Sequence, residues 1–330
     1  MKVSILVPVY GVEKYISQCA QTLFEQTYHD IEYIFVDDCT PDNSIERLQQ
    51  VLAGYPQRQP QVNIIHHESN SGLGAARKTA FEAATGDFVM NVDSDDYLAL
   101  DAVEKLVAKQ KETGADIISS AYMSQFEDGT TILHQEPSLN KADCLNLMLI
   151  QNTLLPHIWA RLIRRNLYIE NGISSVEGIN MAEDLALTPR LIHAAKRIAY
   201  IESVTYYYRD DSSASTFDYR LSIKHVLSLL KANQELWSYF QKRDKENKHL
   251  FALEIGMLNT YHIALKAGLT PKDIAELLSY HPKYWLFCVV HRLFAHKRSK
   301  PLLRFAFLSI KWCYKQRFFM KVRHSSNVLT

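Results

Sequence analysis

Three aspartates, Asp93, Asp95 and Asp96, follow an apolar run at 88–92 that has the length of a buried strand. In open α/β sheets, ligands bind at the edge where the parallel strands end. Carboxylates crowded this closely repel one another unless a cation or hydrogen-bond donors neutralise them. Asp93 and Asp95 could both offer oxygen ligands to Mg²⁺ or Mn²⁺. The spacing predicts a metal site, with a solvated turn that caps the next helix as the alternative.

A second pair of carboxylates, Asp37 and Asp38, follows another apolar run at 31–36. In the turn after it, Asn43 and Glu46 have the spacing of a capping box that opens a helix. Strand-length runs alternate with helical repeats in this part of the chain, which predicts a mostly parallel sheet with helices on both faces. The expected strands are 3–9, 31–36, 62–66 and 88–92, and the expected helices begin near residues 12, 44, 75 and 102.

After residue 113 the pattern becomes less regular. From Phe217 onward it is helical only, and the small polar stretch at 212–216 reads as a boundary. The sequence therefore predicts an α/β domain at 1–215 and a helical region at 216–330. Within the first domain we expect a strand at 116–121, a hairpin through Asp128-Gly129, a helix at 141–151, helices or helical turns at 157–170 and 180–195, the second bent by Pro189, and a strand at 197–208.

Composition and charge narrow the class of protein. At 47% hydrophobic residues the chain is globular, and its first residues read as a strand rather than as a signal peptide, which predicts a cytoplasmic protein. Residues 277–330 hold 11 of the 37 basic residues and no acidic residue, which leaves 26 basic against 36 acidic residues before them. Such a basic tail is typical of a segment that meets an anionic surface. No nucleic-acid recognition motif accompanies the charge, so a membrane surface is the expected partner, and docking of the tail on the acidic part of the chain is the alternative.

Several common motifs are missing or incomplete. Gly72-Leu73-Gly74 is a G-x-G, the first part of a dinucleotide fingerprint, but the third glycine of that fingerprint is absent. The motif also follows the third expected strand and not the first. The absence of any G-x-x-x-x-G-K-[ST] excludes a phosphate-loop NTPase. Tyr97 stands where an aspartyl-phosphate phosphatase would have Thr or Val, which argues against that class of enzyme.

Five ordered segments, spread over residues 2–214, resemble the bacterial family 2 glycosyltransferases with the GT-A fold. They are VSILVPVYGVEKYISQCAQTLFEQTY, IEYIFVDDCTPDNS, NSGLGAARKTAFEAATGDFVMNVDSDDYL, HIWARLIRR and EGINMAEDLAL. The resemblance implies an inverting enzyme that moves a sugar from a nucleoside diphosphate to a hydroxyl acceptor. It implies that Pro8, Tyr10, Asp38, Arg77 and Asp93 hold the nucleotide sugar, that Asp95 and Asp93 bind Mn²⁺ or Mg²⁺, and that Asp184 is the catalytic base.

The chemistry of these residue types agrees with that transfer. A cation on Asp95 would compensate the charge of the departing diphosphate, and a carboxylate placed away from it, Asp184, would take the acceptor's proton. Asp38 could accept a hydrogen bond from a ring N–H, which favours uracil or thymine as the base, and of these we expect uridine in the nucleotide. Two residues have an alternative to nucleotide contact. Arg77 could be a solvated charge on its helix, and Trp159, in the segment HIWARLIRR, could be a core residue or a platform for the acceptor.

We therefore expect a transferase that uses a UDP-sugar and acts on a glycan or lipid-linked acceptor in the synthesis of bacterial surface polysaccharide or lipooligosaccharide. Its basic tail would place it on the inner face of the cytoplasmic membrane. Two other functions stay open. A sugar nucleotidyltransferase is disfavoured because Tyr10-Gly11-Val12-Glu13 is not a glycine-rich basic loop. A noncatalytic nucleotide- or glycan-binding relative would release no nucleotide.

Overall fold

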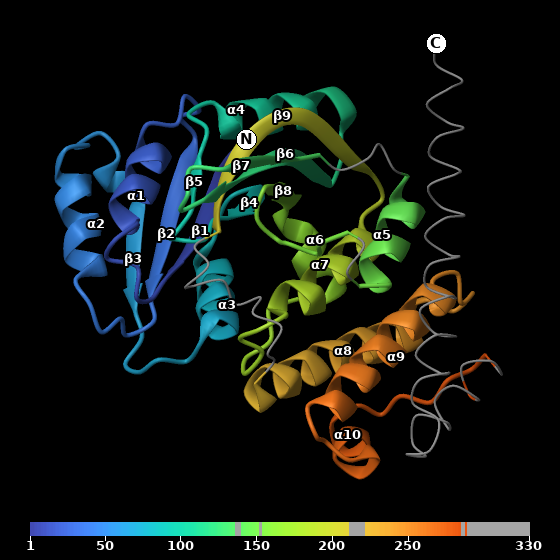
Figure 1. Cartoon of the computed structure of the whole chain (residues 1–330). Helices are drawn as coiled ribbons and strands as arrows, with labels where there is room; N and C mark the ends of the chain where they lie inside the picture. Colours follow the sequence, from blue (N-terminus) through green and yellow to red (C-terminus); the bar gives the residue numbers. More distant parts are fainter. Residues whose placement is uncertain (136–139, 152–153, 211–221, 285–287, 289–330) are drawn as a thin grey trace. The chain divides into compact units, whose positions relative to one another are not determined.

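A computed structural model gives the structure of residues 1–135, 140–151, 154–210, 222–284 and 288 (Figure 1). The chain forms two compact units. One takes in the described residues of 1–136 and 157–218, and the other takes in those of 137–156 and 219–330. We call them the sheet unit and the helical unit. Most of the basic tail lies outside the described residues.

The sheet unit is built on one mixed sheet, whose described strands run in the order β3-β2-β1-β4-β8-β6-β9-β5, with β7 paired to β6. The pairing is parallel from β3 to β4, as predicted, and again between β6 and β9. β8 runs antiparallel to both β4 and β6. The strands are β1 (Val3–Val9), β2 (Ile31–Asp37), β3 (Val62–His66), β4 (Phe88–Asn91), β5 (Tyr97–Leu98), β6 (Ile117–Phe126), β7 (Thr131–His134), β8 (Arg161–Arg164) and β9 (Ile198–Asp210).

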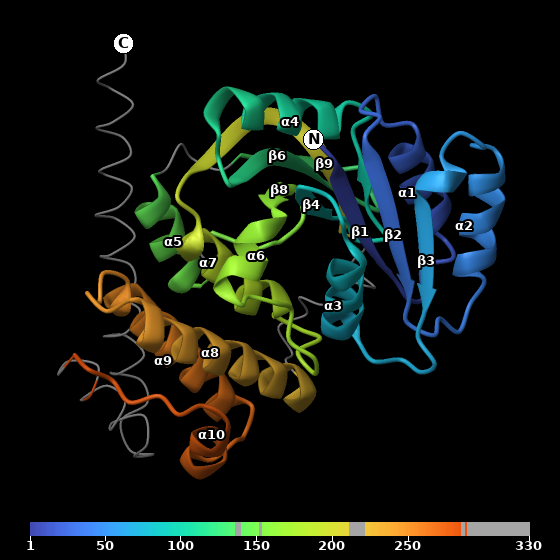
Figure 2. The same ribbon diagram turned by 180° about the vertical axis from the view of Figure 1, so that it is seen from behind.

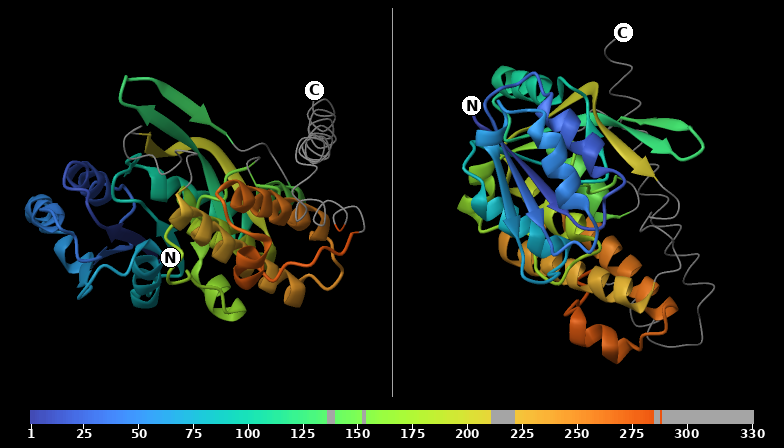
Figure 3. Two further views of the ribbon diagram at one scale, coloured as in Figure 1. Left: turned by 60° about the horizontal axis from the view of Figure 1, so that its bottom comes forward. Right: turned by 90° about the vertical axis from the view of Figure 1, so that its left-hand side faces the viewer.

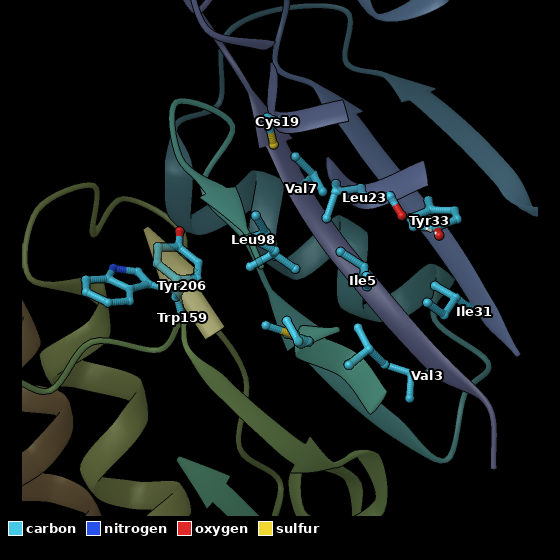
Figure 4. Packing of buried hydrophobic residues seen from close by; sticks show 14 of the residues in the cluster. Val3, Ile5, Val7, Cys19, Leu23, Ile31, Tyr33, Leu98, Trp159 and Tyr206 are labelled. Carbon is cyan, nitrogen blue, oxygen red and sulfur yellow. Dashed lines mark hydrogen bonds between the residues drawn. The ribbon is translucent and has the colours of Figure 1, made fainter. Parts of the chain in front are cut away.

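Helices cover both faces of the sheet (Figures 1 and 2). On one face, Ile5 and Val7 of β1 pack in one apolar cluster with Leu23 of α1 (Ile16–Phe24) and with α4 (Ala102–Thr113), as Figure 4 shows for part of the cluster. α2 (Ser44–Ala53) joins this cluster. On the other face, α3 (Leu73–Ala83) packs on β1 and β2, and α6 (Arg165–Asn171) packs on β4. The sheet unit also contains the short helix η1 (Gln59–Gln61) and α7 (Glu183–Ala194).

The predicted helix at 157–170 is wrong in its first half. Residues Arg161–Arg164 form β8, which lies between β4 and β6 and puts Leu162 and Ile163 into the interior. Two flanking strands satisfy the backbone N–H and C=O groups of this short apolar segment, and that pairing outweighs its helical propensity. The rest of the segment forms α6, as expected. The hairpin of β6 and β7 is also present, and it projects from the sheet in Figure 3.

The predicted capping box of α2 is wrong as well. Asn43 occupies the N-cap position, but its side chain makes no capping hydrogen bond. Its Nδ2 instead donates to both oxygens of Glu13, in the loop after β1, at 3.1 Å. The carboxylate of Asp42 accepts from the backbone N–H of Ser44 at 3.1 Å. Asn43 thus bonds to Glu13 in another loop and not to the backbone of its own helix. Sequence spacing does not reveal such a distant partner.

The helical unit consists of α5 (Lys141–Leu149), α8 (Ile223–Arg243), α9 (Leu250–Lys266) and α10 (Pro271–Leu277) in its described part. α9 packs on α5, α8 and α10. Gly256 of α9 allows the close approach of α5, because a Cβ atom there would lie 2.2 Å from the carbonyl oxygen of Leu149. Inside the unit, Gln151 Nε2 donates to Asn233 Oδ1 at 2.7 Å. α5 therefore belongs with the C-terminal helices, although it precedes β8 in the sequence. None of the helices in the described ranges has the length and apolarity needed to cross a membrane.

Candidate functional site

The predicted site residues gather where β1, β2 and β4 end. These three strands are parallel neighbours, so the residues that follow them meet at one edge of the sheet. Pro8 is buried in β1 opposite Val36, and Tyr10 follows β1 with half of its surface exposed. Asp38 follows β2, and Asp93 follows β4. The edge that the sequence predicts is thus present, with one exposed aromatic ring on it.

Asp38 is buried, and both of its carboxylate oxygens accept local hydrogen bonds. The backbone N–H groups of Ser71 and Gly72 donate to it at 2.8 and 2.7 Å. His67 Nδ1 lies 2.7 Å from Oδ1, and His67 Nε2 lies 2.9 Å from the hydroxyl of Thr79. A carboxylate offers about four acceptor positions, so about one remains for a ligand. Asp38 therefore fixes the loop that leads into α3.

The turn at Gly72-Leu73-Gly74 is close to a segment that is distant in sequence. A Cβ atom at Gly74 would lie 2.4 Å from the carbonyl oxygen of Val176 and 2.8 Å from that of Ile179. A Cβ atom at Gly72, whose φ is +88°, would meet the side chain of Asn180 at 2.2 Å. The two glycines are needed so that the segment before α7 can pack against the start of α3. This explains a G-x-G that lacks the third glycine of a dinucleotide site.

Arg77 of α3 is 2% exposed, so it is not a solvated charge. Its Nη2 donates to Asp93 Oδ1 at 2.7 Å. Its Nη1 donates to Glu183 Oε1 at 2.5 Å and to Asp184 Oδ1 at 2.7 Å. One guanidinium thus joins the aspartate after β4 to the two acids that open α7. Contact between Arg77 and a nucleotide stays a prediction, since its terminal nitrogens already serve these carboxylates.

Two of the carboxylates beside Arg77, the half-buried Glu183 and Asp184, hold their protons more tightly than usual. Burial and the charge of Asp184 raise the pKa of Glu183 to about 8, although Arg77 opposes the shift. Burial also raises the pKa of Asp184, which Arg77 lowers in turn. For Arg77 itself, burial disfavours the charged form, but the three carboxylates hold its pKa well above the usual value. The cluster therefore combines a permanent cation with acids of raised proton affinity.

Asp96 is buried and accepts two hydrogen bonds from residues of β9. The hydroxyl of Tyr206 donates to Asp96 Oδ2 and the backbone N–H of Arg209 donates to Oδ1, both at 2.7 Å. The same hydroxyl accepts from the backbone N–H of Asp93 at 3.1 Å. Burial and the charges of Asp95 and Asp93 raise the pKa of Asp96 well above its usual value. Asp96 thus fixes the turn that carries Asp93 and Asp95.

A metal site fits this turn only if a ligand completes it. Across the part of the chain that the structure describes, no group of three or more His, Cys, Asp or Glu side chains could hold an ion. Asp93 accepts a hydrogen bond from Arg77. Asp95, two residues on, is half-buried. Mg²⁺ is commonly bound by one or two carboxylates together with substrate phosphates. The carboxylates of Asp95 and Asp93 suit an ion of that kind. The capping alternative finds no support in Asp101, whose side chain pairs with Lys105 and does not cap α4.

Trp159 is part of the core. Its ring stacks on His157, Tyr206 and Tyr208, with centroid distances of 4.1, 4.6 and 5.3 Å, and it is 7% exposed. Figure 4 shows it beside Tyr206. Arg161, two residues on, is buried and donates to the carbonyl of His157 at 2.9 Å and to the hydroxyl of Ser119. These contacts give the segment a structural role.

Sequence reasoning missed two residues of the site. His67 orients Asp38, and Tyr206 holds the turn at 93–96. Both bond to residues far away in sequence, so no local spacing could reveal them. Glu183 is visible in the sequence as the acid next to the predicted base, either orienting Asp184 or capping the helix, and the structure shows that it shares Arg77 with Asp184.

Comparisons with known proteins agree with this fold. The profile of the family described as Glycosyl transferase family 2 matches residues 4–172. The chain is 26% identical to the uncharacterized glycosyltransferase EpsJ of Bacillus subtilis over 94% of this chain and 92% of that protein. It is 29% identical to the poly(ribitol-phosphate) beta-N-acetylglucosaminyltransferase TarS of Staphylococcus aureus, over 63% of this chain and 35% of that one.

Among solved structures, the chain is similar to residues 1–349 of S. aureus TarS in complex with UDP-GlcNAc. The TM-score is 0.56 at 20% identity, and the match covers 96% of this chain and 92% of the other. This likeness confirms the predicted fold class, an α/β fold of the GT-A type followed by helices. Because the family profile matches more than half of its residues, the chain belongs to glycosyl transferase family 2.

Proposed function

We propose that this family 2 glycosyltransferase moves a sugar from a UDP-sugar to a hydroxyl of a surface polysaccharide or lipid-linked acceptor, with inversion at the anomeric carbon. One observation carries the proposal. Asp93, from the acidic turn after β4, and Asp184, from the start of α7, are held by the same buried guanidinium. The carboxylate that we propose for the diphosphate side and the one that we propose as the base therefore share one arginine.

The donor would bind at the edge formed by β1, β2 and β4. Tyr10 offers an exposed ring on which a base can stack, and Pro8 lies buried in the strand that leads to it. The remaining acceptor position of Asp38 suits the ring N–H of uracil. Asp95, with Asp93 beside it, would hold Mg²⁺ or Mn²⁺. When bound, such an ion neutralises the negative charge that grows on the diphosphate.

Asp184 would act as the base. It takes the proton of the acceptor hydroxyl while that oxygen bonds to the anomeric carbon from the face opposite the diphosphate. The bond from this carbon to the diphosphate oxygen breaks, and its electron pair leaves with the nucleoside diphosphate. The raised pKa of Asp184 brings its proton affinity closer to the operating pH, where a general base is most effective.

The names of the relatives support a polymer acceptor. TarS acts on poly(ribitol-phosphate), and a relative from Bacillus spizizenii, 32% identical over 63% of this chain, is a poly(ribitol-phosphate) beta-glucosyltransferase. The solved complex of TarS with UDP-GlcNAc supports a UDP-sugar donor. We propose that the protein works in the cytoplasm at the inner face of the membrane, where such acceptors are assembled and where its basic tail would bind.

A panel of nucleotide sugars tests the function. With Mn²⁺ present, one UDP-sugar should raise the melting temperature, because a ligand that binds only the folded state stabilises it. The same donor should release UDP, faster with acceptor than without. Asp95→Ala should nearly abolish turnover, and chelation of the metal should do the same. Asp101→Ala, at a half-exposed aspartate of the same segment that pairs with Lys105, is the matched control and should keep full activity.

Each alternative predicts a different result. A nucleotidyltransferase would form a nucleotide sugar and pyrophosphate from a nucleoside triphosphate and a sugar phosphate. A binding protein would be stabilised by nucleotide and would release none. Full turnover in excess chelator, or in Asp95→Ala, would contradict the assignment of the metal.

A further inference from the structure

Arg77 connects two parts of the site that the chain brings from different elements. Its Nη2 binds Asp93, and its Nη1 binds Glu183 and Asp184, all within 2.7 Å. Charge-assisted hydrogen bonds of this kind are short and directional, and the planar guanidinium sets the angle between them. The separation between Asp93 and Asp184 is therefore set by the width of one rigid group.

The helix that carries Arg77 is itself fixed at its start. Asp38 accepts from the backbone of Ser71 and Gly72 just before α3. The carbonyl groups of Val176 and Ile179 pack against Gly74 in the first turn of the helix. Arg77 therefore extends from a helix that is already anchored to the segment leading into α7. Its own burial leaves its side chain little freedom.

On the basis of the proposed function, we propose that Arg77 is a positioning residue that holds Asp93 on the donor side and Asp184 on the acceptor side at a fixed separation, with Glu183 as its second anchor. Glu183 accepts the shorter of the two hydrogen bonds from Nη1 and so keeps the guanidinium turned toward α7. In this role Arg77 acts through the two aspartates and does not itself bind the nucleotide.

The competing role is the nucleotide contact implied by the family resemblance. Three of the five N–H groups of Arg77 serve carboxylates, so such a contact would use the second N–H of Nη2 or the buried Nε, which has no partner among the described residues. The two roles differ in what they change. A nucleotide contact contributes to UDP affinity, whereas a positioning residue contributes to the rate of the bound complex.

Arg77→Lys separates the two roles. A lysine keeps the charge but has one compact ammonium, which cannot hold carboxylates on two sides in a fixed fork. We expect kcat to fall about 100-fold, the usual effect of a displacement of about 1 Å between reacting groups. The affinity for UDP, measured by calorimetry, should fall much less than kcat, because Asp95 and the other donor-side residues stay in place. A loss of UDP affinity as large as the loss of kcat/KM, or full activity in the variant, would overturn the proposal.

Lys78→Gln is the matched control. Lys78 is the next residue of α3, and its Nζ pairs at 2.7 Å with Glu177 in the segment before α7. This ion pair joins the same two segments as Arg77 does, but at the surface. Its removal should leave kcat and UDP affinity unchanged. A loss of kcat equal to that of Arg77→Lys would show that any link between the segments suffices, which would also overturn the proposal.

Glu183 provides a second test, in case Arg77→Lys does not fold. Glu183→Ala removes an anchor and should lower kcat, while Glu183→Gln keeps an oxygen that can accept from Arg77 and should restore most of it. The proposal fails if Glu183→Ala retains the wild-type kcat, or if Glu183→Gln is as slow as Glu183→Ala.

A measurement that needs no activity distinguishes failure of the function from failure of the positioning role. If the wild-type chain binds no nucleoside diphosphate, the proposed function is wrong. The coupling is then read from the stability losses, measured by denaturation, of Arg77→Gln, Glu183→Ala and the double variant. A shared hydrogen bond predicts that the double variant loses less stability than the sum of the two single losses. Additive losses would overturn the link between Arg77 and Glu183.

Discussion

Asp184 has the surroundings that a general base needs. Its carboxylate lies in the first turn of α7 and accepts from Arg77 at 2.7 Å. Burial raises its pKa, and the positive charge of Arg77 lowers it in part. Ala182, two residues before it, is held at φ +61°, a left-handed conformation that is costly for a residue with a Cβ atom. The chain thus accepts local strain where it presents this carboxylate.

The first prediction concerns Asp184→Asn. The amide keeps the shape of the side chain but cannot take a proton, so kcat should fall by roughly 10²- to 10⁴-fold, the range for a positioned base. The affinity for the donor should barely change. Steady-state kinetics with calorimetry of UDP binding checks both values, and Asp101→Asn is the control. A variant that loses donor affinity together with rate would place Asp184 in the nucleotide site.

The second prediction concerns the proton on Glu183. Its pKa is about 8 in the folded chain, against an ordinary value of 4.5. Between these pH values the folded state binds a proton that the unfolded state has lost. The free energy of unfolding should therefore fall as pH rises through this window, by up to about 1.4 kcal/mol per pH unit for one proton. Glu183→Gln should remove this contribution.

Denaturation of the wild type and of Glu183→Gln at pH 5, 6.5 and 8 measures the effect. The difference in the free energy of unfolding between the wild type and the variant should become smaller with each increase in pH. Glu177→Gln is the control, since Lys78 lowers the pKa of the exposed Glu177 and moves its titration below this window. A constant difference between the wild type and Glu183→Gln would show that Glu183 titrates normally.

At the scale of elements, the contact between α3 and the segment before α7 depends on Gly74. The third prediction is that Gly74→Ala destabilises the fold by about 1–3 kcal/mol, the usual cost of overpacking, because the new Cβ atom would meet two backbone carbonyl groups. It should also lower kcat, since the displaced segment leads into Glu183 and Asp184. In an open helix, alanine would instead be favoured over glycine by about 1 kcal/mol.

Gly54→Ala is the matched control for this variant. Gly54 ends α2 at φ −76°, and the nearest neighbour of its Cβ atom would be the carbonyl oxygen of Val51 at 3.3 Å. Urea denaturation should show a much smaller change there, and kcat should stay at the wild-type value. Equal losses in the two variants would mean that the packing at Gly74 has no special role.

The elements that sequence predicts well are those with local signals. Alternation of strands and helices predicts β1 to β4 and their flanking helices, because each strand is a mostly apolar run bounded by turn residues. β8 is missed, since its strand conformation depends on pairing with β4 and β6. The site follows the same rule. The spacing of the acids marks Asp93 and Asp95, whereas the contact of Arg77 with α7 arises only when the chain folds.

At the scale of the whole molecule, charge is divided between the acidic body and the basic tail at 277–330. The fourth prediction is that the intact protein pellets with vesicles that contain anionic lipid at low salt, and less so at high salt. Each cation near such a surface contributes about 1 kcal/mol, and salt screens the attraction. A chain that ends after Cys288 should stay in the supernatant.

The structure sets where this truncation should fall. The buried Glu254 of α9 accepts from the backbone N–H groups of Lys283 and Tyr284 at 2.5 and 3.4 Å. A cut near residue 282 would remove both donors and leave a buried carboxylate with fewer partners, which is costly. A cut after Cys288 keeps them. Equal pelleting of both forms, or of neither, would show that the tail does not bring the protein to membranes.

The helical unit is discontinuous in sequence, and this matters while the chain is being made. α5 leaves the ribosome before β8 and β9, yet it packs on α9. About 100 residues separate the two helices, so at 5–20 residues per second α5 waits about 5–20 s for its partner. During that time its apolar side, with Leu145 and Met148, has no α9 to cover it. Substitutions in α9 should therefore lower the yield of folded protein through aggregation during synthesis, even where the finished enzyme would tolerate them.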